Sequence, residues 1–196
     1  HGYNSHLHDR DEMAQNIAVY YAMVSLMDKY IGQILDRLES VGLADNTLVV
    51  FTTDHGHLFG QHGMIAKGGF HYEDLIRLPY IVRAPGQVAP GKRSTALQSL
   101  IDLPVTFLRW AGIEVPRSMV GVDQGPVWRG ESAMARDHCV VENRHEPTTI
   151  HIKTYIEDRF KLTVYFRHDY GELFDLLEDP GEIRNLWDSP EHQALK

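Results

Sequence analysis

Cysteine, clustered basic residues and long apolar runs are all scarce in this chain of 196 residues. Its single cysteine, Cys139, excludes an intramolecular disulfide framework. No apolar run approaches the roughly 20 residues that cross a bilayer, and no signal-peptide pattern opens the chain. The 19 Lys and Arg are outnumbered by 27 Asp and Glu and form no cluster, which argues against general nucleic-acid binding. A small anionic substrate remains compatible, because a local site can oppose the net charge of -8.

What is present is an ordinary globular composition, with 43% hydrophobic and 23% charged residues. The length suits one sizeable domain, or a domain with a small appendage. His1 is not an initiator methionine, and the residues that follow it are typical of a loop. We therefore expect the chain to begin inside a larger protein. Any targeting signal would then lie upstream, which leaves the compartment open.

The first half of the chain has the pattern of an α/β fold. Apolar residues at spacings of three and four predict a helix over Asp11–Val41, with Gly42 as its left-handed C-terminal cap. The apolar run Thr47–Thr53 is typical of a strand buried on both faces of a parallel sheet. A second short strand is expected over Tyr80–Arg83. These elements predict part of a mainly parallel sheet flanked by helices.

Near Gly130 the expected elements change from helices and a polar connection to short strands, so we place a boundary between residues 1–130 and 131–196. Before it, Ser99–Ile113 is expected to form a helix with Asp102 as its N-cap. After it, "HCVVEN", "TTIHIKTYIED", "RFKLTVYFR" and "GELFDLL" predict a small antiparallel sheet. Asp179, Pro180 and Glu182 form a capping-box pattern, which predicts a C-terminal helix.

Asp54 and His55 follow the first predicted strand directly, at the edge where α/β proteins bind ligands. The carboxylate and the imidazole can both bind a divalent cation, and Gly56 lets the backbone turn away at once. Lys67, on a flexible stem with three donors, suits the oxygens of a phosphate or sulfate. On these residues alone a plain polar turn remains the alternative. His57, His62 and His71 are expected to line the same cleft, and for them a plain surface loop is the alternative.

Three longer stretches resemble the sulfatases of the alkaline phosphatase superfamily. Tyr20–Gly86, which contains "FTTDHGHLFGQHG", is similar to the second half of their catalytic domain, and the similarity continues through Ser99–Pro116. Gly171–Leu186, "GELFDLLEDPGEIRNL", resembles their C-terminal signature. The resemblance implies an alkaline-phosphatase-like fold. Residues 1–130 would be the C-terminal half of the catalytic domain and residues 131–196 a small α+β subdomain.

The resemblance also implies roles for the residues around the Asp-His-Gly turn. Asp54 and His55 match a metal-binding pair, usually around calcium, with magnesium as the alternative. Lys67 matches the catalytic lysine that contacts the sulfate, and His62 falls beside the sulfated small molecule or glycan. The family's nucleophile is a formylglycine made within a Cys/Ser-x-Pro-x-Arg motif, which this sequence does not contain. We therefore expect a fragment that does not turn over substrate alone.

Two other functions remain open at this point. A phosphodiesterase or phosphonate monoester hydrolase of the same superfamily carries a similar Asp-His and Lys arrangement. A non-catalytic module could keep the scaffold for binding or assembly. We also expect the fragment to self-associate, because a parallel sheet cut through its middle exposes backbone donors and apolar side chains.

Overall fold

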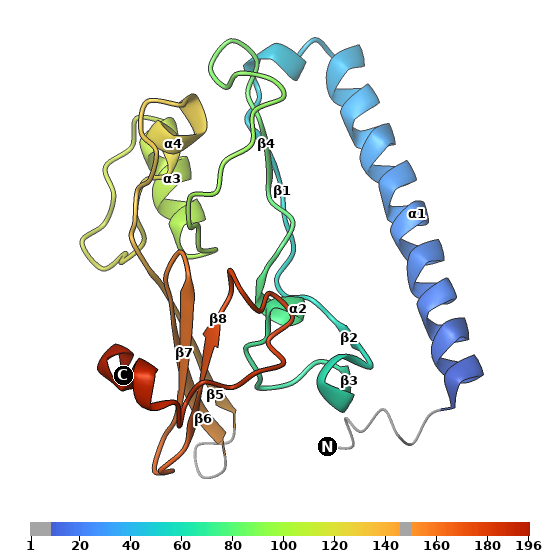
Figure 1. Ribbon diagram of the computed structural model, residues 1–196. Helices are drawn as coiled ribbons and strands as arrows, with labels where there is room; N and C mark the ends of the chain where they lie inside the picture. Colours follow the sequence, from blue (N-terminus) through green and yellow to red (C-terminus); the bar gives the residue numbers. More distant parts are fainter. Residues whose placement is uncertain (1–8, 146–149) are drawn as a thin grey trace. The chain divides into compact units, whose positions relative to one another are not determined.

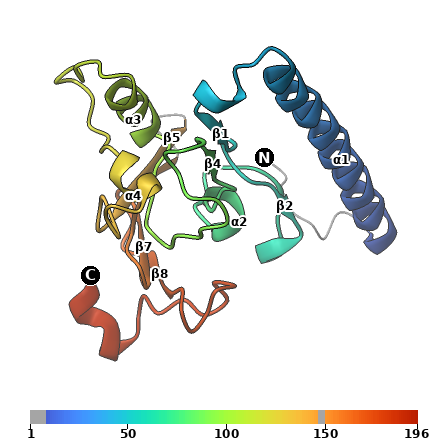
Figure 2. The same cartoon turned by 90° about the horizontal axis from the view of Figure 1, so that it is seen from above.

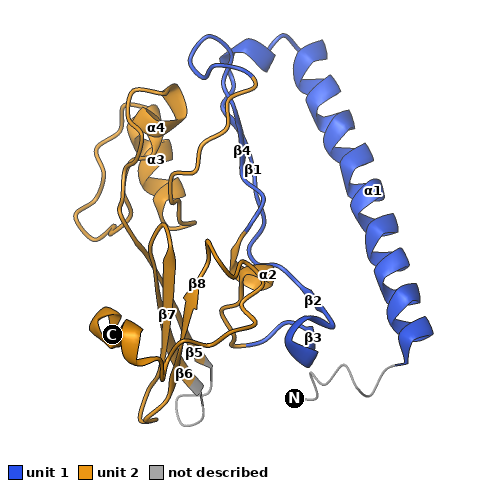
Figure 3. Ribbon diagram, in the orientation of Figure 1, with its two compact units in different colours: residues 1–68, 78–90 blue, residues 69–77, 91–196 orange. Residues whose placement is uncertain are grey.

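The computed structural model describes residues 9–145 and 150–196, and the chain divides into two compact units. Unit 1 comprises residues 1–68 and 78–90, and unit 2 comprises residues 69–77 and 91–196 (Figure 3). Unit 2 is thus discontinuous in sequence, since a nine-residue segment of it interrupts unit 1. The boundary expected near Gly130 stays a prediction.

Unit 1 opens with the long helix α1, Arg10–Ser40 (Figure 1). The carboxylate of its N-cap, Asp9, accepts a hydrogen bond of 2.8 Å from the backbone N–H of Glu12. Gly42 has a φ of 73°, which confirms the predicted left-handed cap. None of the residues of α1 is buried. Its exposed large apolar side chains are Val19, Tyr20, Tyr21, Met23, Val24, Leu26, Met27, Tyr30 and Ile34.

The strands of unit 1 pair in two short antiparallel ribbons. After the 3-10 turn η2, Ala44–Asn46, strand β1, Val49–Phe51, pairs with β4, Ile81–Arg83. Strand β2, Leu58–Phe59, pairs with β3, Ile65–Ala66. Every strand pairing among the described residues is antiparallel, so the prediction of a mainly parallel sheet is wrong for this chain. An apolar run shows that a strand is covered, but it does not identify the neighbour or its direction.

Unit 2 contains three short helices, α2, Glu73–Ile76, α3, Asp102–Trp110, and α4, Gly125–Arg129. Helices α3 and α4 lie side by side (Figure 2). A ring contact of 6.0 Å between the centroids of Trp110 and Trp128 joins them. The N-cap of α3 is Ile101, so the prediction that Asp102 caps this helix is wrong.

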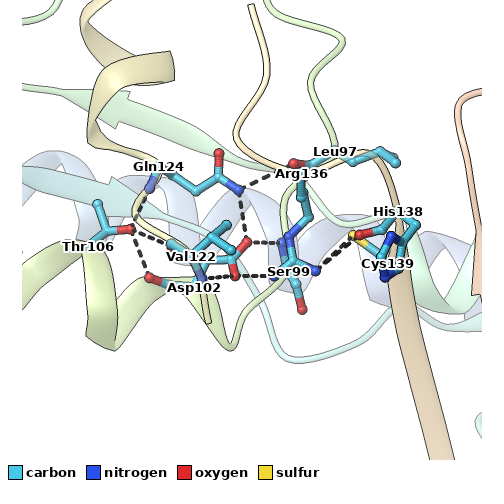
Figure 4. A network of polar contacts seen from close by, with 9 residues as sticks. All are labelled: Leu97, Ser99, Asp102, Thr106, Val122, Gln124, Arg136, His138 and Cys139. Carbon is cyan, nitrogen blue, oxygen red and sulfur yellow. Dashed lines mark hydrogen bonds and ion pairs between the residues drawn. The ribbon is translucent and has the colours of Figure 1, made fainter. Parts of the chain in front are cut away.

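Asp102 instead occupies the centre of a buried polar network (Figure 4). One carboxylate oxygen accepts from the backbone N–H of Val122 at 2.9 Å and from Arg136 Nη2 at 2.5 Å. The other oxygen accepts from the backbone N–H of Ser99 at 3.0 Å and from Gln124 Nε2 at 2.8 Å. Four donors therefore converge on one carboxylate with no exposed surface. They join α3 to the segment before α4 and to the approach to the C-terminal sheet.

The C-terminal sheet confirms the antiparallel prediction. It contains β5, Cys139–His145, β6, Ile150–Ile156, β7, Phe160–Tyr165, and β8, Gly171–Asp175, paired in that order. Burial alternates along β7, but its buried positions are the polar residues Lys161 and Thr163, whereas Val164 is exposed. The buried apolar side chains include those of Cys139, Ile152, Leu173, Phe174 and Leu186.

The chain after β8 forms turns where a helix was expected. Asp179 Oδ2 accepts from the backbone N–H of Arg184 at 2.7 Å, and Glu182 has a φ of 54°. That φ is incompatible with a helix, so the predicted capping box is wrong. The only helical segment after β8 in the described chain is the 3-10 helix η4, Pro190–Leu195. Among the residues that the structure describes, no helix is both long and apolar enough to cross a membrane.

Candidate metal and anion site

The candidate site lies in unit 1, just beyond the end of β1. Thr52 and Thr53 follow the strand, and Asp54 is the first charged side chain after it. Asp54 thus lies just beyond a strand end, as predicted from the sequence. Asp54 Oδ1 accepts from the backbone N–H of His55 at 3.0 Å and from Thr53 Oγ1 at 3.3 Å. The Asp54 side chain is 81% exposed, so its carboxylate is open to a ligand.

The ring of His55 is held in one orientation by the backbone of the next residue, Gly56. Its Nδ1 lies 2.8 Å from the carbonyl oxygen of Gly56, a contact that requires a proton on Nδ1. The other ring nitrogen, Nε2, faces both charged side chains of the site. It lies 2.9 Å from Lys67 Nζ and 3.5 Å from Asp54 Oδ2. A carboxylate, an imidazole nitrogen and an ammonium group thus meet within one short segment of unit 1.

The β2–β3 hairpin brings Lys67 to this position. Leu58 pairs with Ala66, so the chain doubles back between His55 and Lys67. Gly60, with a φ of 107°, makes the turn that a side chain would strain. Because the hairpin is short, two residues that are twelve positions apart in sequence come into contact.

The electrostatics of the site favour an anionic carboxylate. The backbone hydrogen bond from His55, and then the attraction of the His55 ring, lower the pKa of Asp54 below its usual value. Burial, and then repulsion from His55 and Lys67, lower the pKa of His57. The ring of His57 lies 4.5 Å from that of Phe59, so it contributes to packing at the base of the hairpin.

The donor set of Asp54 and His55 fits a divalent cation in type but not in number. A deprotonated carboxylate and an imidazole whose Nδ1 bonds a carbonyl are the arrangement found at protein metal sites. Calcium takes six to eight oxygen ligands, however, and the described residues contain no group of three or more His, Cys, Asp or Glu that could hold a metal. The two residues can supply part of a metal site, and the other ligands have to come from elsewhere.

The other two predicted histidines behave differently from each other. His62 lies in the 3-10 turn η3, Gln61–Gly63, half-buried and with a φ of 54°, within the same hairpin as Lys67. His71 is 7% exposed and belongs to unit 2, where its Nδ1 lies 2.7 Å from Thr154 Oγ1. Burial, and then repulsion from Lys161, lower the pKa of His71 to about 4. His71 is therefore a structural residue, not one that lines an open cleft.

A second charged cluster, which was not predicted from the sequence, surrounds Lys161 in unit 2. Lys161 is 1% exposed and contacts Glu73 and Glu182. One signal was present: "FKLTVYF" places Lys161 and Thr163 at alternating positions in an otherwise apolar strand. In an antiparallel sheet, such residues share one face and need polar partners if that face is covered.

Two family models match the chain. The sulfatase model matches residues 2–113, and the model of the C-terminal part of N-sulphoglucosamine sulphohydrolase matches residues 60–196. The chain belongs to the sulfatase family. The second match covers all of β5 to β8, so the family membership of this chain rests on the C-terminal sheet as well as on the candidate site.

Individual relatives agree with this assignment. An N-acetylglucosamine-6-O-sulfatase of Bacteroides thetaiotaomicron is 34% identical over 88% of this chain and 32% of its own length. A choline-sulfatase of Rhizobium meliloti is 32% identical over 87% of this chain and 33% of its own length. The chain thus spans about a third of the length of these curated relatives.

Solved structures confirm the fold. A protein in complex with its substrate D-glucosamine-2-N,6-O-disulfate superposes with a TM-score of 0.83 and 32% identity over 90% of this chain and 37% of that chain. A 2-O glycosaminoglycan sulfatase gives a TM-score of 0.87 and 28% identity over 95% of this chain and 42% of that chain. The phosphonate monoester hydrolase of Agrobacterium radiobacter gives 0.84 and 26%, over 94% and 39%.

Proposed function

We propose that this chain is part of an enzyme that hydrolyses sulfate esters, in which Asp54 and His55 bind a divalent cation and Lys67 contacts the sulfate. The contact of 2.9 Å between Lys67 Nζ and His55 Nε2 carries the proposal, because it brings a positively charged hydrogen-bond donor next to a candidate metal ligand. The exposure of Asp54 and its lowered pKa support it further. Calcium is the expected ion, with magnesium as the alternative.

Each residue would have a separate task in this chemistry. A bound cation would supply positive charge beside the transferring group. Asp54 would hold it through a carboxylate oxygen, and His55 through Nε2 once Lys67 turns from that nitrogen to the sulfate. Lys67 would donate hydrogen bonds to sulfate oxygens, whose charge grows during the reaction. The nucleophile is expected to be a formylglycine in a part of the protein that this chain does not span.

The substrate is proposed to be a sulfated glycan or another small sulfate ester. The names of the relatives support this class, since they include sulfatases of N-acetylglucosamine, of unsaturated hexuronate and of choline. His62 is proposed to contact the substrate from the same hairpin as Lys67, because it lies five residues before Lys67 and is only half-buried.

The decisive experiment uses the protein encoded by the complete reading frame. Release of sulfate from an aryl sulfate is measured with and without a chelator, for the parent protein and for Lys67→Ala. Loss of one preorganised donor should lower turnover roughly 100-fold. Lys92→Ala, at an exposed lysine remote in sequence, is the matched control and should leave turnover unchanged. Chelator-resistant turnover, or full activity of Lys67→Ala, would contradict the proposal.

A phosphonate monoester hydrolase is the second candidate, because two such enzymes superpose on this chain at 26% and 30% identity. The same preparation is therefore offered an aryl phosphonate monoester and an aryl phosphodiester beside the aryl sulfate. A clear preference for either phosphorus substrate would indicate that the protein is a phosphonate monoester hydrolase or a phosphodiesterase. No turnover of any ester by the complete protein would leave a binding or assembly module.

The separate chain is proposed to be inactive and to self-associate. The nine exposed apolar side chains of α1 support association, because burying them against a second copy would remove apolar surface from water. Light scattering at several concentrations should show species larger than 22.4 kDa. A monomer at all concentrations, with a cooperative melt, would refute this part of the proposal.

A further inference from the structure

Tyr20 joins helix α1 to the β2–β3 hairpin, and both elements belong to unit 1 (Figure 3). The centroid of the Tyr20 ring lies 4.9 Å from that of Phe59, with the rings edge to face. It lies 5.9 Å from that of His57, with the rings nearly parallel. The rings of His57 and Phe59 are 4.5 Å apart. These distances are typical of favourable aromatic contacts, so the three residues form one cluster, the Tyr20 cluster.

The β2–β3 hairpin is too short to keep its shape alone. Each strand has two residues, and Leu58 pairs with Ala66 and Phe59 with Ile65. A hairpin of two strands is marginally stable in water unless another element packs against it. Helix α1 packs against it through Tyr20, which contacts a paired residue of β2 and the residue directly before that strand.

Part of the hairpin backbone also has an unfavourable conformation. Ala66 has a φ of 66° and His62 a φ of 54°, in the left-handed region that residues with a side chain seldom adopt. Such conformations persist where the surrounding structure enforces them. Ala66 directly precedes Lys67. The direction in which the chain presents Lys67 therefore depends on packing that keeps the hairpin in place.

His55 is close to the same cluster along the chain. Only Gly56 separates it from His57, and the carbonyl oxygen of Gly56 lies 2.8 Å from His55 Nδ1. On the other side of the ring, Nε2 lies 2.9 Å from Lys67 Nζ. Both partners of this contact are thus attached to the hairpin: His55 is two residues before the ring of His57, and Lys67 is one residue after β3.

We propose that Tyr20 is a positioning residue for Lys67: by packing against His57 and Phe59 it fixes the hairpin, and so keeps Lys67 Nζ beside His55 Nε2. Helix α1 then takes part in the anion site without supplying a ligand. The catalytic consequence rests on the proposed function of Lys67, whereas the position of Lys67 can be measured in the chain whatever its function is.

The first test measures hydrogen exchange of peptides covering residues 57–67 in the 196-residue chain, well below the melting temperature of each variant. Tyr20→Leu removes the ring, and Tyr20→Phe keeps it. Tyr21→Leu is the matched control at the next position of α1, where the side chain is 64% exposed, against 37% for Tyr20. We expect roughly 10-fold faster exchange in Tyr20→Leu and no change in the other two variants.

The second test follows Lys67 itself. Acetic anhydride reacts with free amines, so a lysine that contacts His55 Nε2 has to leave it before it reacts. The acetylation rate of Lys67 is measured by mass spectrometry relative to that of the exposed Lys92 in the same chain. This ratio should rise several-fold in Tyr20→Leu and stay at the wild-type value in Tyr20→Phe. A purely structural role of Tyr20 would lower the melting temperature without changing the ratio.

The third test uses the protein encoded by the complete reading frame and an aryl sulfate. Displacing a catalytic group by a small distance slows the chemical step, so kcat should fall roughly 10-fold in Tyr20→Leu. KM should change less, because Lys67 acts mainly on charge that grows in the transition state. If Tyr20→Leu does not fold, Phe59→Leu removes the partner ring on the hairpin and should change all three measurements in the same direction.

Unchanged hydrogen exchange in folded Tyr20→Leu would overturn the inference. Faster exchange with an unchanged acetylation ratio would also overturn it, because the hairpin would move without affecting Lys67. If both change while kcat does not, Tyr20 has no positioning role in the reaction. If both change in a protein that hydrolyses no sulfate ester even as wild type, the positioning of Lys67 is supported and its proposed function is wrong.

Discussion

Replacing Asp102 with alanine is expected to be among the most destabilising single changes in unit 2. The carboxylate has no exposed surface and accepts from four donors, one of them the guanidinium of Arg136. Removing one partner of a buried ion pair costs about 3–5 kcal/mol, because the other charge is left without compensation. The Arg136 side chain is 13% exposed, so water can solvate it only in part.

The expected loss can be converted into a melting temperature. For a chain of this size, 1 kcal/mol corresponds to about 2–4 °C, so Asp102→Ala should lower the melting temperature by on the order of 10 °C. All three tryptophans, Trp110, Trp128 and Trp187, lie in unit 2, so their fluorescence reports on this unit alone. Urea titrations followed at these tryptophans measure the change in free energy of unfolding.

The matched control is Asp36→Ala, at an exposed position of α1. It should change the free energy of unfolding by less than about 0.5 kcal/mol. A loss below about 1 kcal/mol for Asp102→Ala would refute the reasoning, since it would mean that the four donors find other partners. The double variant Asp102→Leu with Arg136→Met should recover part of the loss, because neither charge is then left unpaired.

Three further predictions concern unit 2. Burial lowers the pKa of His71 from 6.5 to about 4, so the stability that the neutral ring contributes is complete above pH 6.5 and is lost as the pH falls to about 4. Urea titrations across this range should show that the free energy of unfolding falls by about 3 kcal/mol. The variant His71→Asn should not show this pH-dependent loss. Burial raises the pKa of the Cys139 thiol and so lowers the amount of the reactive thiolate. Ellman's reagent at pH 8 should therefore react about 100-fold more slowly with the folded protein than with the unfolded one. Equal reaction rates would contradict this prediction. Gly171→Ala would push a methyl group into the Trp187 ring and should lower the free energy of unfolding by about 2 kcal/mol in a urea titration. Gly181→Ala is the control, because the added methyl group would have no neighbour nearer than 3.6 Å, and it should leave this free energy almost unchanged.

Local patterns predicted the elements well. The spacing of apolar residues identified α1, and Gly42 marked its end, because both features depend only on neighbours within a few residues. The four strands of the C-terminal sheet were also predicted, since each is short, alternating and bounded by turn residues. The position of Asp54 and His55 beyond a strand end is visible in the sequence for the same reason.

Partners distant in sequence were not predictable in this way. The pairing of β1 with β4 depends on which strands are available, and an apolar run carries no information about them. Glu182 matches a capping box by its spacing, yet a buried lysine 21 positions earlier determines its conformation. The sequence gives no sign that His71 is buried, because its neighbours Thr154 and Lys161 lie more than 80 positions away in the chain. The family resemblance supplied the roles at the candidate site, which composition and spacing had left open.

The Lys161 cluster also has a consequence for how the protein is made. Glu73 leaves the ribosome 109 residues before Glu182, the residue to which its backbone N–H donates. At a synthesis rate of about 5–20 residues per second, this separation corresponds to a delay of roughly 5–20 s. Until β6 and β7 have been synthesised, residues 71–73 have no sheet to attach to. Unit 2 can close only after residue 182 has emerged, so a nascent chain arrested before that residue should remain open to proteases.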